Sequence, residues 1–201
     1  MEKSELHRIL DTQKKAHLKD GPLSLAQRKD WIDRLINSII KHQKQLPEAI
    51  SEDFSHRSKT SSLLADVASS ITSLKIAKKN IKKWMKPSKR EVSPKILSFL
   101  GAKLRVEYQP LGTVGLISPW NFPVVLTFGP LGSIFAAGNR VMIKPSEFTP
   151  ITSELMKQMF KENFSEDDVA VVTGGPEIGA EFSSLPVDHL LFTGATSIGC
   201  L

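Results

Sequence analysis

Apolar residues recur at three- and four-residue steps along the first ninety residues, which is the period of one face of a helix. The predicted helices cover residues 4–19, residues 24 to about 46, a short segment that ends at Phe54, and residues 60–85. Ser24 and Gln27 stand three residues apart at the start of the second helix, as in a capping box. A break is expected near Pro47. This part of the chain is therefore predicted to be a helical region.

The pattern changes after Pro94, where short apolar runs begin to alternate with helical periods. Residues 103–109 alternate apolar and polar side chains, which predicts a half-exposed strand. Further strands are expected at residues 113–118, 141–144, 169–173 and 190–193, and helices at residues 124–137, 151–161 and 176–183. Apolar strands that alternate with helices indicate a parallel sheet covered on both faces. We therefore predict an α/β fold with an N-terminal helical region, residues 1–94, and an incomplete Rossmann-like sheet in residues 95–201.

Much of the basic charge lies in one segment, because eight Lys and Arg residues crowd positions 75–90 of a chain whose net charge is +6. The apolar residues there keep the helical period, so the basic side chains fall mostly on the opposite, solvated face. Neither an aromatic platform nor zinc-finger spacing accompanies them, so no binding to nucleic acid is expected. A single cysteine excludes a disulfide framework and a multi-cysteine metal site. The dispersed histidines likewise predict no metal site.

The longest uncharged stretch, residues 108–139, contains four prolines and five glycines. A membrane-spanning helix does not tolerate such repeated interruption, so we interpret the stretch as buried core and expect no membrane partner. The charged N-terminal segment has no apolar region of the kind that signal peptides carry. Together with the single cysteine, this predicts a cytoplasmic location.

Polar or glycine residues follow every strand of the predicted parallel sheet. These four segments cover residues 118–121, 144–147, 173–175 and 193–195. Rossmann-like sheets bind their ligands outside the carboxyl ends of the strands, so the segments are candidate binding loops. The glycine-rich segment 174–179 is not G-x-G-x-x-G and alone is a weak cofactor signal. The sequence has neither a P-loop nor a G-x-S-x-G elbow.

Five short motifs occur in order along the second half of the chain. They are L-G-T-V-G at 111–115, S-P-W-N-F-P at 118–123, A-G-N-R-V at 137–141, K-P-S-E at 144–147 and F-T-G-A at 192–195. With them the sequence resembles the aldehyde dehydrogenase superfamily, and within it the branch that includes coniferyl aldehyde dehydrogenases. The resemblance is specific over residues 103–199 and looser over the N-terminal helices.

The resemblance implies a role for residues of the second and fourth motifs. Asn121 matches the asparagine whose side-chain amide donates to the thiohemiacetal oxyanion. Trp120 looks like a wall of the same pocket, and with Ser118 it is counted with the cofactor-binding residues. Lys144 and Glu147 resemble the family's grip on the cofactor ribose. The residue types alone favour a loop-capping role for Asn121, and they leave open a surface ion pair for Lys144 and Glu147.

Glycines and small residues complete the implied cofactor site. Gly175 and Gly179 would let the backbone approach the adenosine part of the cofactor. Thr193, Gly194 and Ala195, with Gly199 beyond them, resemble a pyrophosphate turn, where free amides at a helix N-terminus meet the anion. The family commonly has serine at the position of Ala195, which keeps only the backbone donor. The implied cofactor is NAD or NADP, and NAD is favoured because a carboxylate at 147 repels a 2′-phosphate.

The family reaction needs a cysteine nucleophile and a general-base glutamate, both of which lie downstream of the F-T-G motif. The sequence contains neither the E-L-G-G-K motif nor the nucleophile's segment, so the catalytic domain is absent from it. Cys200 lies beside the implied pyrophosphate turn and is not placed as that nucleophile.

The first hypothesis is therefore that the chain is the N-terminal fragment of an NAD(P)-dependent aldehyde dehydrogenase. The substrate of that enzyme would be an aldehyde such as an aromatic one, and the fragment would be inactive alone. The alternatives are a non-catalytic dinucleotide-binding module, or an interaction protein that docks on a longer dehydrogenase chain. The sequence also leaves open whether the chain forms a homo-oligomer.

Overall fold

Four strands form the main sheet, all parallel and in the order β5-β4-β3-β6. The strands are β3 (Thr113–Ile117), β4 (Arg140–Lys144), β5 (Val169–Val171) and β6 (His189–Phe192). The computed structural model describes residues 3–200. The prediction of an α/β fold with a parallel sheet is confirmed, and the four expected strands are present with their ends shifted by at most two residues.

The two central strands are buried along nearly their whole length. Val114 pairs with Val141, and Leu116 pairs with Ile143. Strands of this kind read as continuous apolar runs because both faces of the sheet are covered.

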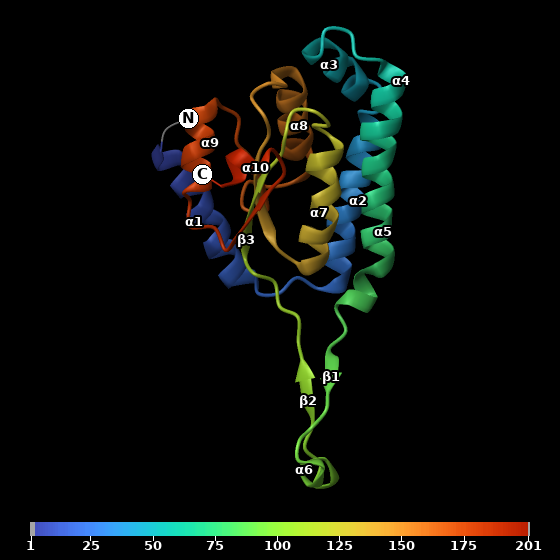
Figure 1. Cartoon of the computed structure of the whole chain (residues 1–201), viewed down its shortest axis with the longest axis vertical. Coiled ribbons are helices and arrows are strands. Elements are labelled where there is room, and N and C mark those ends of the chain that lie inside the picture. Colours follow the sequence, from blue (N-terminus) through green and yellow to red (C-terminus); the bar gives the residue numbers. More distant parts are fainter. Residues whose placement is uncertain (1–2, 201) are drawn as a thin grey trace.

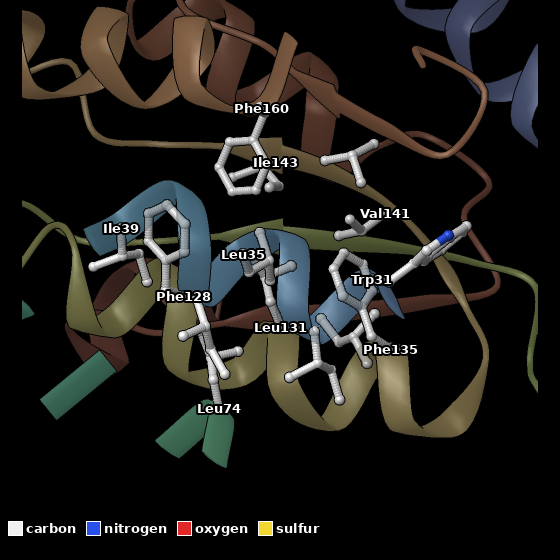
Figure 2. Close-up of a cluster of buried hydrophobic side chains, with 14 of the residues drawn as sticks. Trp31, Leu35, Ile39, Leu74, Phe128, Leu131, Phe135, Val141, Ile143 and Phe160 are labelled. Atoms are coloured by element: carbon white, nitrogen blue, oxygen red, sulfur yellow. The ribbon is translucent and has the colours of Figure 1, made fainter. Parts of the chain in front are cut away.

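One face of the sheet packs against a thick layer of helices (Figure 1). The layer contains α2 (Leu25–Lys41), α7 (Val125–Ala137) and α8 (Pro150–Asn163), with α3 (Gln45–Asp53) and α5 (Ser69–Trp84) around them. Figure 2 shows how Trp31 and Leu35 of α2 meet Phe135 of α7 beneath the strands. The Trp31 and Phe135 rings meet edge to face, with centroids 5.2 Å apart. Residues of the predicted regions 1–94 and 95–201 thus share one apolar core.

The opposite face is covered by α1 (Lys3–Asp20) and α9 (Pro176–Ser183). Leu6 and Leu10 of α1 pack with Phe182 of α9 against Met142. The buried Gln13 Nε2 donates to the carbonyl oxygens of Val141 and Glu166, each at 3.0 Å. The first helix is therefore tied to the sheet by polar as well as apolar contacts.

The N-terminal helices follow the predicted pattern with one correction. The capping box of α2 is present, since Gln27 N donates to Ser24 Oγ at 3.3 Å and Ser24 N donates to Gln27 Oε1 at 2.9 Å. The expected helix 60–85 is observed as α4 (Lys59–Ser62), a π-helical turn η1 (Leu63–Ala68) and α5. The break expected near Pro47 falls instead just before Gln45. Pro47 lies in the first turn of α3, where no backbone amide is needed.

A long arm projects from the body (Figure 1). It contains β1 (Ser88–Arg90) and β2 (Leu104–Val106), an antiparallel pair, with α6 (Lys95–Phe99) at its end. The strand predicted at 103–109 is shorter than expected and exposed at every position, because it pairs only with β1. Sequence periodicity missed β1 and α6, which are too short to show a period.

The uncharged stretch 108–139 forms β3 and α7, which are largely buried inside the protein. Within residues 3–200, no helix is long and apolar enough to cross a membrane. In the same part of the chain, no group of three or more His, Cys, Asp or Glu side chains is arranged to hold a metal ion.

Candidate functional site at the carboxyl edge of the sheet

The loops that follow the four parallel strands meet at one edge of the sheet. Ser118 N donates to the Lys144 carbonyl at 3.2 Å, and Thr193 N donates to the Ile117 carbonyl at 3.1 Å. The chain runs from β3 to β4 to β5 and then returns to the other side of β3 as β6. The strand order therefore reverses between β3 and β6, which makes this edge a topological switch point, where α/β sheets bind ligands.

Ser118 anchors the loop that follows β3. Its side chain is buried, and its Oγ lies 2.7 Å from Thr127 Oγ1 of α7, which itself donates to the Pro123 carbonyl at 2.7 Å. Trp120 next in the loop is half exposed, and its ring centroid lies 6.0 Å from that of Phe54. Ser118 thus holds the loop to α7, while the Trp120 ring forms part of the open surface.

Asn121 presents its side chain on the exposed part of this loop. Its Oδ1 accepts from Phe122 N at 3.2 Å, and its backbone carbonyl accepts from Arg57 Nη1 at 2.7 Å. None of the hydrogen bonds formed by residues 3–200 uses Asn121 Nδ2. The amide group is therefore oriented by its oxygen and keeps its N–H donors for another acceptor.

A buried ion pair that the sequence analysis did not single out supports the Asn121 loop from below. Asp66 in η1 is fully buried, and its Oδ1 accepts from the amides of Val124 and Val125 at the start of α7, each at 3.2 Å. Its Oδ2 accepts from Arg57 Nη2 at 3.4 Å. The Arg57 guanidinium also lies over the Phe122 ring, 4.7 Å from its centroid.

Burial raises the pKa of Asp66, while the two amides and the Arg57 charge oppose that rise. The first amides of a helix have no intrahelical partner, so a buried carboxylate at this point satisfies two of them. The available signal in the sequence was a charged residue within the predicted helix 60–85, but helical periodicity does not say which side chain it meets.

Lys144 and Glu147 lie together at the end of β4. Lys144 is buried, and its Nζ donates to the Pro145 carbonyl at 2.9 Å and to Glu147 Oε2 at 3.4 Å. Glu147 lines a cavity of about 310 Å³ that also includes Thr173 and Gly174 from the end of β5 and Glu154 of α8. The structure thus brings the K-P-S-E motif and the third binding loop around one hollow.

The predicted glycines differ in what surrounds them. A Cβ at Gly175 would lie 2.6 Å from Glu177 Oε2, and one at Gly194 would lie 2.5 Å from the Phe192 ring. Gly199 approaches the same ring, whereas nothing lies within 4 Å of a Cβ built at Gly179. Ala195 is the N-cap of α10 (Thr196–Gly199), a single turn that follows Thr193 and Gly194. Gly194 therefore has a local steric reason, whereas the Glu177 side chain could move away from a Cβ at Gly175, and the surface over Gly179 is open.

A parallel sheet with a switch point and four polar loops at its carboxyl edge belongs to the Rossmann-like class of α/β proteins. Comparison of the sequence with known families narrows this class to one family. All of residues 1–201 match the aldehyde dehydrogenase family, and the chain belongs to that family.

Several matched relatives carry the name coniferyl aldehyde dehydrogenase. A probable coniferyl aldehyde dehydrogenase of Caulobacter vibrioides is 54% identical over 196 residues, which are 98% of this chain and 40% of that protein. The coniferyl aldehyde dehydrogenase of a Pseudomonas species is 47% identical over 194 residues, 96% of this chain and 39% of that protein. The chain therefore spans about 40% of the length of these relatives.

Solved structures agree with the fold. Substrate-bound AldH of Staphylococcus aureus superposes with a TM-score of 0.89 at 29% identity, over 96% of this chain and 42% of that one. An aldehyde dehydrogenase of Bacillus cereus, solved in complex with NAD⁺, gives a TM-score of 0.84 at 25% identity, over 98% of this chain and 40% of that one. The family and the fold expected from the motifs are both confirmed.

Proposed function

We propose that this chain is the N-terminal, cofactor-binding part of an NAD(P)-dependent aldehyde dehydrogenase that acts on aromatic aldehydes of the coniferyl type. The observation that supports it most is the Lys144–Glu147 pair at the cavity between the ends of β4 and β5. The names of the two relatives support the substrate class. The aldehyde is the substrate to be oxidised, and the carboxylic acid is the product.

The residues of the carboxyl edge fit a dinucleotide. Glu147 lines the cavity, no hydrogen bond among the described residues uses its Oε1, and its carboxylate would accept hydrogen bonds from ribose hydroxyls. Lys144 holds that carboxylate in place through its Nζ. The amides that open α10 would face the pyrophosphate, next to Gly194 and Ala195. We propose NAD rather than NADP, because the Glu147 carboxylate repels a 2′-phosphate.

Asn121 is proposed to stabilise the oxyanion of the reacting aldehyde. Its Nδ2 keeps its donors, and its Oδ1 is fixed by the Phe122 amide. A donor aimed at developing negative charge is worth about 3 kcal/mol in a transition state. When bound, the nicotinamide accepts the hydride from the aldehyde carbon. Since this sequence contains no segment that resembles the family's nucleophile or general base, we propose that the chain turns over no aldehyde by itself.

Titration of the purified chain with NADH, followed by nicotinamide fluorescence, tests the proposal. We expect saturable binding that Glu147→Gln weakens about tenfold, because charge-assisted hydrogen bonds to the ribose are lost. Glu52→Gln, an exposed carboxylate on α3, is the matched control and should leave the affinity unchanged. A folded chain that fails to bind NADH, or equal losses in both variants, would contradict the cofactor site. Steady turnover of an aldehyde would contradict the inactive fragment.

A second candidate is a chain that works by docking on a longer dehydrogenase chain. The outer edge of the sheet supports it, because β6 pairs only with β3 and its residues are exposed or partly exposed. Copurification of a longer dehydrogenase chain from native cells would support docking, and a chain that stays monomeric and copurifies alone would count against it.

A further inference from the structure

A second and larger cavity, of about 570 Å³, opens at the amino edge of the sheet, away from the candidate site. It lies where the root of the arm meets the C-terminal ends of α5 and α7, below the sheet in Figure 1. Its lining includes Arg28, Lys83, Trp84, Lys86, Tyr108 and Ser133. Cavities that bind small molecules range from about 300 to 1,000 Å³, so the space suits an organic ligand.

Positive charge is concentrated in this cavity. Three cationic side chains line it, from Arg28 of α2 and from Lys83 and Lys86 at the end of α5, and none of the lining residues is acidic. Elsewhere on α5, Lys78 pairs with Asp33 at 2.5 Å. Within residues 3–200 no carboxylate forms a salt bridge with any of the three cavity cations.

Arg28 is fixed in the wall. It is only 5% exposed, its Nε donates to the Leu23 carbonyl at 2.8 Å, and its Nη1 donates to the Ala136 carbonyl at 2.9 Å. No hydrogen bond among the described residues uses Nη2. Burial lowers the pKa of Arg28, as expected for a cation without a carboxylate partner.

The helix ends do not cancel this charge. The C-termini of α5 and α7 reach the cavity, and each carries about half a negative charge from its free carbonyls. Three full positive charges outweigh them. The net field in the cavity therefore attracts an anion with more than one negative charge.

Aromatic rings form the rest of the wall. Trp84 at the end of α5 and Tyr108 at the root of the arm are both partly exposed, so each offers a ring surface to a ligand. Ser133 of α7 adds a hydroxyl that can donate or accept. Planar ligand rings stack on such side chains, and cationic side chains hold phosphate or similar groups.

We propose that this cavity binds an aromatic anion: a planar ring that carries a phosphate or another doubly charged group. The anion lies on Arg28 Nη2 and on the ammonium groups of Lys83 and Lys86, and the ring lies against Trp84 and Tyr108. The site is separate from the proposed dinucleotide site, so it stands whether or not the chain binds NAD.

Phenyl phosphate is the probe, because it has the ring and the dianion but lacks the ribose that Glu147 would bind. Its binding to the full chain is measured by calorimetry. Lys83→Gln/Lys86→Gln is expected to weaken binding about tenfold or more, since two charged hydrogen bonds are lost. The control Lys75→Gln/Lys79→Gln removes the same charge from exposed positions of α5 that do not line the cavity. It should change the affinity less than twofold.

Four results would overturn the proposal. The first is that a folded chain does not bind phenyl phosphate, and the second is that both double variants lose the same affinity. The third is that inorganic phosphate binds as tightly as phenyl phosphate. The fourth is that the ligand quenches the fluorescence of Trp120 rather than that of Trp84. Variants that keep either Trp84 or Trp120 as their single tryptophan show which of the two is quenched. NADH binding measured on the same preparations shows whether the other site is intact.

Discussion

At the scale of single residues, the least expected feature is the buried carboxylate of Asp66. It links three parts of the chain, because it accepts from two amides at the start of α7 and pairs with Arg57, which in turn holds the Asn121 carbonyl. A buried carboxylate is tolerated only when it is paired and hydrogen-bonded. Asp66 therefore acts as a support for the proposed oxyanion donor rather than as a reacting group.

Asp66→Ala should lower the free energy of unfolding by about 3 kcal/mol or more, because two buried amides and the Arg57 charge lose their partner. Asp66→Asn keeps an oxygen acceptor for both amides and should lose less. Urea denaturation of both variants measures the difference. Equal losses would show that the acceptor at this position does not matter.

The same residue predicts a pH dependence. Because burial raises its pKa in the native state, folding favours protonated Asp66. Its contribution to stability is fully present below the unfolded pKa, about 3.9, and is lost as pH rises through the native pKa. The stability of Asp66→Asn relative to the wild type should therefore rise from acidic to neutral pH. A difference that is flat or falls over this range would contradict the raised pKa.

At the scale of elements, the turn between α7 and β4 shows that not every family motif residue belongs to the site. Gly138 is the left-handed C-cap of α7, with φ of +87°. Asn139 Oδ1 accepts from Leu111 N at 2.7 Å and from Gly112 N at 3.1 Å, which fixes the entry to β3. Arg140 pairs with Asp20 of α1 and, at 3.5 Å, with Asp168. The A-G-N-R motif thus joins α7, β3 and α1, at the edge of the sheet away from the candidate site.

Gly138 at the end of α7 and Gly179 within α9 make a matched pair. Gly138→Ala should destabilise the protein by about 2 kcal/mol or more, since its backbone is left-handed and a Cβ would lie 2.7 Å from Arg28 Cζ. Gly179→Ala lies within α9, where nothing stands within 4 Å of a Cβ, and should stabilise the helix by up to about 1 kcal/mol. Thermal unfolding of the two variants checks the opposite signs. The same sign for both would refute the argument from backbone geometry.

At the scale of the whole molecule, the sheet ends in a strand with little cover. Leu190 of β6 is 36% exposed, and Ile198 of α10 next to it is more exposed. The arm adds further exposed apolar side chains, among them Phe99 and Leu100. Unpaired parallel edges and large apolar surfaces favour association with other chains. The isolated chain is therefore expected to be marginally stable or to depend on a partner.

Leu190→Lys should reduce self-association, because a charge on an edge strand opposes further pairing. Ile76→Lys is the control, since Ile76 is 54% exposed on α5, a helix that packs against α2 and α7 rather than against β6. Light scattering over a concentration series measures the effect, and circular dichroism shows that both variants are folded. If both variants reduce scattering equally, net charge rather than the β6 edge governs association. Copurification of a longer dehydrogenase chain with the wild type alone would support the docking hypothesis.

The family, the order of the elements and the loops of the carboxyl edge could all be predicted from the sequence. It could do so because buried strands, amphipathic helices and short motifs are properties of neighbouring residues. Ser118, Lys144 and Thr193 could be assigned to one edge, since parallel strands all end on the same side. Which atoms they meet was left open.

Contacts between residues that are distant in the chain became visible in the folded protein alone. The hydrogen bonds of Arg57 to Asn121 and of Val124 to Asp66 join residues that are 64 and 58 positions apart in the chain. The cationic cavity likewise joins Arg28 to Lys83 and Tyr108. The arm also escaped the sequence analysis, because its strands contain three residues each and pair only with one another. Such contacts depend on packing between elements, and that information is not present in the local pattern of hydrophobic and polar residues.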